Sequence, residues 1–103
     1  MKSFRFRQGD VLILLAEPLD NFHQVKLPHL VLAEGEVTGH KHQITEGQAE
    51  LIKKDKVLFL RVLSETAVLS HEEHQPIQIP QGTWMVRIQR EYDPTAQPRL
   101  VVD

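Results

Sequence analysis

The chain has 103 residues, 41% of them hydrophobic and 25% charged, which is the balance of a soluble globular protein of one domain. The net charge is −2, so the chain has no excess of the basic residues that bind phosphate groups. Nucleic acid and membranes are therefore disfavoured as partners. The sequence shows no membrane-length apolar run, secretory signal or cysteine, so we expect a cytoplasmic protein without disulfides or thiolate chemistry.

The first third of the chain contains several segments with the character of β-strands, in which alternation of apolar and polar residues marks a strand with one wet face. Residues 2–8 (KSFRFRQ) alternate in this way, whereas residues 10–17 (DVLILLAE) are almost continuously apolar, as in a strand buried on both sides. Residues 19–28 (LDNFHQVKLP) are irregular and predict a loop, and residues 29–35 (HLVLAEG) predict another strand.

The second half of the chain begins with a hairpin signal, in which two apolar segments within 49–62 flank a polar turn near Lys54 and Asp55. Residues 66–70, 76–80 and 83–92 predict further strands, with a turn at 81–82, and residues 93–103 predict one helical turn before a last short strand. No window sustains helical periodicity. We therefore predict a single all-β domain over residues 1–103, a small β-barrel or sandwich, and favour a barrel of about seven to nine strands.

Histidine is the unusual feature of the composition, with six residues of which four form two tight pairs. His40 and His42 are two positions apart, so on an extended strand both side chains project to the same face. His71 and His74 are three positions apart on a polar segment, where a tight turn could bring the rings together. His23 and His29 are interpreted as surface residues.

Neutral imidazole combined with carboxylate is a ligand set for zinc, iron, manganese, nickel or copper. We therefore predict a site for a divalent metal made by His40, His42, His71 and His74, with Glu46 as the carboxylate. Four closed ligands would make the metal structural, and three with an open position would suit catalysis. The sequence identifies no substrate and no catalytic residue.

The segment GHKHQITEG (39–47) resembles the first motif of the cupin superfamily, small β-barrels in which HxH and a following Glu bind a metal inside the barrel. The resemblance implies His40, His42 and Glu46 as ligands. In cupins a Pro-x-Gly turn precedes the next histidine, whereas here PQG (80–82) follows both. The chain also resembles a family of small uncharacterised bacterial proteins through GEVTGHKH (35–42), HEEHQPIQIPQGTW (71–84) and QREY (89–92).

Two other classes of function stay open. The first is a non-enzymatic module that binds a protein or small-molecule partner, or assembles as a homo-oligomer through edge strands, with histidines at the interface and no metal. The second is a pH-responsive element, because paired imidazoles repel one another once both are protonated.

Overall fold

In the computed structural model, which describes residues 5–35 and 37–89, eight strands form one antiparallel sheet. No helix in the described ranges is long and apolar enough to cross a membrane. The strands are β1 (Arg5–Gln8), β2 (Val11–Leu15), β3 (Gln24–Lys26), β4 (Val31–Glu34), β5 (Lys41–Glu46), β6 (Ala49–Lys54), β7 (Val57–His71) and β8 (His74–Ile88).

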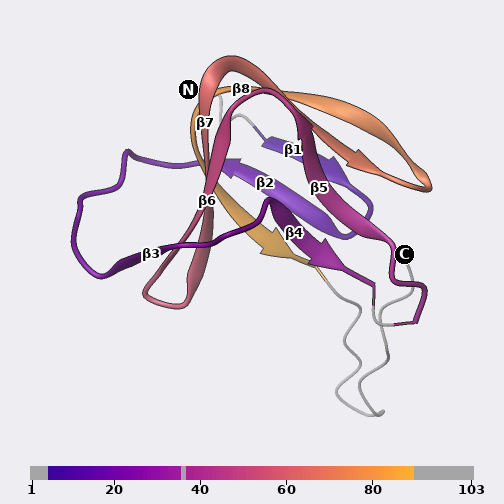
Figure 1. The fold of residues 1–103 in the computed structure, drawn as a ribbon, viewed down its shortest axis with the longest axis horizontal. Coiled ribbons are helices and arrows are strands. Elements are labelled where there is room, and N and C mark those ends of the chain that lie inside the picture. The colour runs from indigo at the N-terminus through magenta and orange to yellow at the C-terminus, as the bar shows by residue number, and fades with distance from the viewer. Residues whose placement is uncertain (1–4, 36, 90–103) are drawn as a thin grey trace.

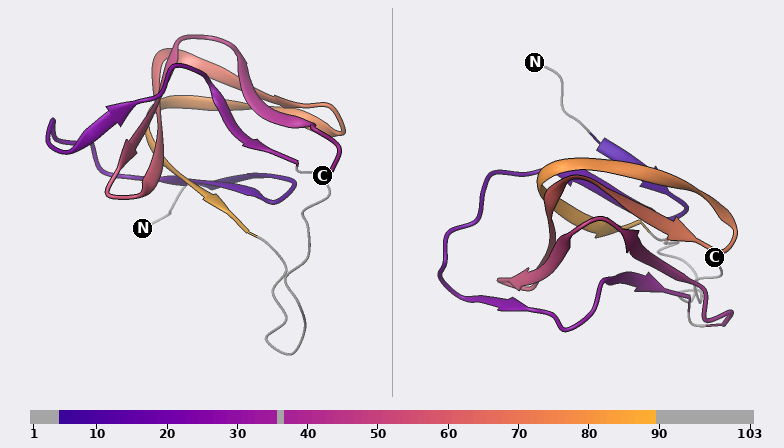
Figure 2. Two further views of the ribbon diagram at one scale, coloured as in Figure 1. Left: turned by 60° about the horizontal axis from the view of Figure 1, so that its bottom comes forward. Right: turned by 45° about the horizontal axis from the view of Figure 1, so that its top comes forward.

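The sheet is organised around the long hairpin of β7 and β8 (Figure 1). The strand order is β1-β2-β8-β7-β5-β4, and β6 pairs with the first half of β7 and with β3. Because β7 pairs with β6 along one half and with β5 along the other, the sheet bends and curls into a half-barrel. Figure 2 shows this curl from two further directions. The all-β prediction is confirmed.

Three two-residue turns join the paired strands and fix their register. Gly9 and Asp10 connect Gln8 with its partner Val11, and Glu72 and Glu73 connect the paired His71 and His74. The predicted hairpin at 49–62 is confirmed, although its turn lies one residue later, at Asp55 and Lys56. Both of these residues have positive φ, 52° and 67°, as a type I′ turn requires.

Two sequence predictions about the connections are wrong. The predicted loop 19–28 contains β3, which pairs with β6 and so gains strand structure from a partner remote in sequence. The predicted turn at 81–82 does not exist, because β8 runs through Gly82, which pairs with Val62. The predicted strands 66–70 and 76–80 are therefore parts of β7 and β8. The predicted helical turn and last strand at 93–103 lie outside the described residues.

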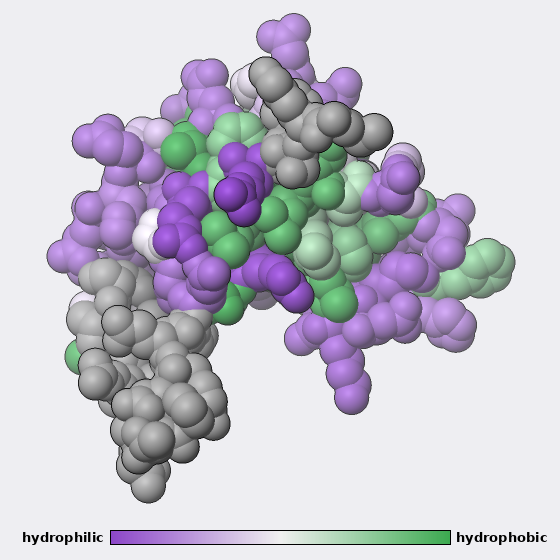
Figure 3. All heavy atoms as spheres, turned by 180° about the vertical axis from the view of Figure 1, so that it is seen from behind, coloured by the Kyte–Doolittle hydropathy of each residue, from purple (hydrophilic) through white to green (hydrophobic). Residues whose placement is uncertain are grey.

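The core is formed mainly by alternate buried residues of β2, β7 and β8, together with Leu32, Ile44 and Leu51 from β4, β5 and β6. Trp84 is 2% exposed, and its indole N–H donates to the Pro80 carbonyl at 3.0 Å. Phe6 packs edge-on against this ring, with centroids 5.5 Å apart. Figure 3 shows the back of the molecule, where apolar side chains gather at the centre and polar ones surround them.

Candidate functional site

The two histidine pairs come from neighbouring strands at one end of the half-barrel. His71 ends β7 and His74 begins β8, and the two are direct cross-strand partners. Next to them, β5 pairs with β7 through Gln43 and Ser70, which places His42 beside His71. His40 precedes β5 by one residue.

The rings of all four residues lie close to one another, and we call His40, His42, His71 and His74 the histidine group. The shortest separation of ring centroids is 4.1 Å, between His42 and His71. His71 and His74 follow at 4.6 Å, His40 and His71 at 5.7 Å, and His42 and His74 at 6.0 Å. His42 and His71 are buried, whereas the His40 side chain is 28% exposed.

The end of β1 and the turn that follows it bring in three residues that the sequence did not reveal, Gln8, Gly9 and Asp10. Gln8 is 2% exposed, and its Oε1 lies 2.9 Å from His42 Nδ1. Its amide nitrogen donates to the carbonyls of Leu69 and Gln75, both at 2.9 Å. This one side chain therefore joins β1 to β5, β7 and β8. Only the Gly-Asp turn signal in "QGD" marks this segment, and it does not reveal the histidines as partners.

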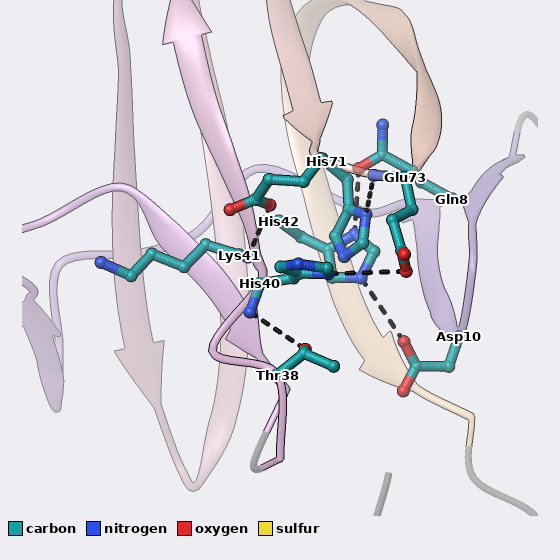
Figure 4. Close-up of polar contacts among 9 residues, drawn as sticks. Gln8, Asp10, Thr38, His40, Lys41, His42, His71 and Glu73 are labelled. Atoms are coloured by element: carbon teal, nitrogen blue, oxygen red, sulfur yellow. Dashed lines mark hydrogen bonds and ion pairs between the residues drawn. The ribbon is translucent and has the colours of Figure 1, made fainter. Parts of the chain in front are cut away.

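Asp10 lies on the other side of the His42 ring (Figure 4). Its Oδ1 is 3.5 Å from His42 Nε2, beyond the usual range of about 2.7–3.2 Å for an N–H···O hydrogen bond. The Asp10 side chain is 22% exposed and the His42 side chain 1%. A buried imidazole is thus flanked by two oxygen atoms, an amide oxygen at Nδ1 and a carboxylate oxygen at Nε2.

The turn of the β7–β8 hairpin supplies two further carboxylates. The Glu73 backbone N–H donates to His71 Nδ1 at 3.0 Å, and Glu73 Oε1 lies 3.5 Å from His40 Nδ1. Glu72 Oε1 accepts a hydrogen bond from the Lys41 backbone N–H at 2.9 Å. This bond holds the pKa of the Glu72 carboxyl below its usual range, and ties the start of β5 to the hairpin. Figure 4 shows the contact between Glu73 and His40 beside the other rings.

Gly9 gives the rings room. It has φ of +60°, and a Cβ at this position would lie 2.7 Å from His74 Nε2 and 3.3 Å from His42 Cε1. A side chain at residue 9 would therefore collide with the His74 ring and crowd the His42 ring.

The remaining predicted residues lie elsewhere. Glu46 is exposed and pairs with Val68, four residues along β5 from His42, or about 13 Å at the usual strand rise. His23 and His29 are exposed, as predicted, and His29 Nδ1 accepts the Val31 N–H at 3.2 Å. Among residues 5–35 and 37–89, no group of three or more histidine and acidic side chains is arranged so that it could hold a metal ion.

Comparison with known families places the chain in a group without an assigned activity. A family described as a domain of unknown function (DUF8820) matches residues 7–89. The chain belongs to this family. The DUF8820 region includes Gln8, Asp10 and the whole histidine group, and it agrees with the predicted membership of an uncharacterised family. No curated protein and no solved structure matched the chain.

Proposed function

We propose that this DUF8820 protein binds one divalent metal ion through His42, Asp10 and further members of the histidine group. The observation that carries the proposal is the environment of His42. Its buried ring faces Gln8 Oε1 at one nitrogen and Asp10 Oδ1 at the other, at 2.9 Å and 3.5 Å. A neutral imidazole has only one N–H to donate, and a cation between Nε2 and the carboxylate would be attracted to both.

The spacing of the two groups supports this assignment. Two ligands of a tetrahedral metal, each bonded at about 2.0–2.2 Å, lie about 3.4 Å apart. The distance from His42 Nε2 to Asp10 Oδ1 is 3.5 Å. We assign His74 as the third ligand because its ring and that of His42 both lie beside Gly9, with His74 Nε2 2.7 Å and His42 Cε1 3.3 Å from the position that a Cβ would take there.

Completion of the ligand shell requires rotation of side chains. His71 Nδ1 accepts a backbone N–H, so in its neutral form this ring carries its proton on Nε2. In this orientation neither nitrogen of His71 offers a lone pair to a metal, and the ring would have to rotate to become a ligand. His40 and His74 are only partly buried and can turn about their side-chain bonds, whereas Gln8 holds His42. Two or three imidazoles and one carboxylate, without sulfur, suit zinc, iron, manganese or nickel.

A metal at this position would connect the β1–β2 turn, β5 and the β7–β8 hairpin. Because a ligand that binds only the folded state stabilises that state, metal at about 100 times its Kd adds about 2.7 kcal/mol to the free energy of unfolding. Three protein ligands would leave a further position for water or a small ligand.

The proposal is tested by titrating tag-free, metal-stripped protein with Co²⁺ and following visible absorption. We expect one equivalent to bind, and His74→Ala to weaken binding at least about tenfold, an effect of the size seen on disturbing metal sites. His23→Asn is the matched control: it removes an exposed imidazole before β3, and asparagine tolerates the positive φ of 55° at this position.

Cobalt binding with the affinity of the wild type in both His74→Ala and Asp10→Asn would contradict the assigned ligands. The absence of saturable binding of cobalt, zinc, iron, manganese or nickel would contradict metal binding altogether. If His74→Ala then changed the oligomeric state of the metal-free protein, measured by light scattering, the histidine group would belong to an interaction surface.

A further inference from the structure

We infer that Gln8 is a positioning residue that fixes the tautomer of His42, so that Nδ1 carries the proton and Nε2 presents its lone pair toward Asp10. The inference deepens the proposed metal site and rests on it for its functional meaning. The tautomer itself is a property of the metal-free protein and can be measured without any metal.

The orientation of the Gln8 amide follows from its surroundings. Its terminal nitrogen lies 2.9 Å from two carbonyl oxygens, those of Leu69 and Gln75. Carbonyl oxygens only accept hydrogen bonds, so this end of the amide must be the NH₂ group, which has one hydrogen for each carbonyl. Rotation of the amide by 180° would place an oxygen against two oxygens. The opposite end, Oε1, is therefore the atom that faces His42.

The same reasoning then applies to His42. Gln8 Oε1 is an acceptor and lies 2.9 Å from His42 Nδ1, so Nδ1 must supply the proton. In a neutral ring Nε2 is then unprotonated. Because Gln8 is 2% exposed and His42 1%, water does not compete freely for either group. The backbone carbonyls of two strands thus determine, through one amide, which nitrogen of His42 can bind a cation.

This arrangement matches the way metal-binding histidines are oriented in general, with the second ring nitrogen donating to an oxygen acceptor. Without Gln8, Nε2 could carry the proton and donate it toward Asp10, and a metal would then have to displace that proton. Loss of such an orienting partner typically weakens metal affinity about 10- to 100-fold.

The test uses ¹⁵N-labelled, metal-free protein at about pH 8.5, two units above the ordinary histidine pKa of about 6.5. Long-range ¹H–¹⁵N correlation spectra report which ring nitrogen bears the proton, and the signals of His42 are identified by their loss in His42→Ala. We expect a protonated Nδ1 in the wild type. In Gln8→Met, which keeps the size of the side chain but removes the acceptor, we expect the proton to move to Nε2.

Two variants separate orientation from simple destabilisation. Gln8→Glu loses both donated hydrogen bonds yet keeps an acceptor at His42, so Nδ1 should stay protonated. Ile13→Val, a core change on the buried strand β2, should leave the tautomer unchanged. If Gln8→Met does not fold, the spectra of the wild type and of Gln8→Glu still test the inference.

A wild-type His42 with its proton on Nε2, or an unchanged tautomer in folded Gln8→Met, would overturn the role of Gln8. Cobalt titration of the same samples completes the test, with an expected 10- to 100-fold loss of affinity in Gln8→Met only. If the wild type binds no metal while the tautomer behaves as expected, the proposed function fails and the role of Gln8 stands.

Discussion

A methyl group at residue 9 is the smallest change that would enter the proposed metal site. Gly9 lies in the β1–β2 turn, and the Cβ of Gly9→Ala would lie 2.7 Å from His74 Nε2. Ordinary van der Waals contact begins at about 3.4 Å. The His74 ring must therefore retreat by about 0.7 Å, whereas metal sites hold their bond lengths to within about 0.2 Å.

Gly39→Ala is the matched control for this change. Gly39 also has a positive φ, +75° against +60° for Gly9, but a Cβ there would meet nothing within 4 Å. Both variants place alanine in a left-handed conformation, which costs about 1–2 kcal/mol. In a domain of this size that corresponds to a fall in Tm of about 4–16 °C for each.

The two variants should therefore resemble each other in stability and differ in metal binding. We expect Gly9→Ala to bind Co²⁺ at least about tenfold more weakly than the wild type, and Gly39→Ala to bind it normally. Thermal unfolding by circular dichroism and cobalt titration measure the two properties on the same samples. Equal cobalt affinities in Gly9→Ala and the wild type would refute the placement of the metal in front of Gly9.

Three further predictions concern the fold and the carboxylates. Gly47→Ala should lower the free energy of unfolding, measured in urea, by about 2–5 kcal/mol. The reason is that Gly47 has φ of +88° and that the new Cβ would collide with the Thr66 backbone carbonyl. A loss below about 1 kcal/mol would contradict this contact. Glu72 has a pKa lowered from 4.5 by the N–H of Lys41, so the stability it contributes is present above pH 4.5 and is lost as the pH falls below it. Glu72→Gln should therefore make stability less dependent on pH in that acid range, and identical pH profiles would argue against the bond. Asp10→Asn should weaken metal binding, measured by calorimetry, at least about tenfold. It should change the free energy of unfolding of the metal-free protein by less than about 1 kcal/mol, because the carboxylate is partly exposed.

The strands could be predicted from the sequence where one face is buried. Trp84 and Val86 are buried on β8, as period-two alternation indicates. On β2, which was expected to be buried on both sides, Val11 and Ile13 are fully buried but Leu15 is 49% exposed. The length of β7 and β8 could not be predicted. Pro80 and Gly82 are typical of a turn, but here Pro80 pairs with Thr66 beside a register shift, where a bulge tolerates both residues.

The spacing of residues in the sequence predicts only part of the candidate site. The separation of His71 and His74 fits a two-residue turn, and the rings lie 4.6 Å apart. Gln8 and Asp10 contact His42 across more than 30 residues of sequence, and only the pairing of β1, β2, β5, β7 and β8 in one sheet brings them there. Glu46 is the carboxylate nearest to His42 in the sequence, four residues away. Because those four residues lie along an extended strand, Glu46 is about 13 Å from His42.

Elemental analysis tests the central claim most directly. Wild type and His74→Ala would be produced without a histidine tag, purified without chelator and analysed by plasma mass spectrometry for zinc, iron, manganese and nickel. Metal binding through the histidine group predicts about one equivalent of a single divalent metal in the wild type and a clear loss in His74→Ala. Equal metal content in both proteins, or none in the wild type even after reconstitution with each of the four metals, would contradict it.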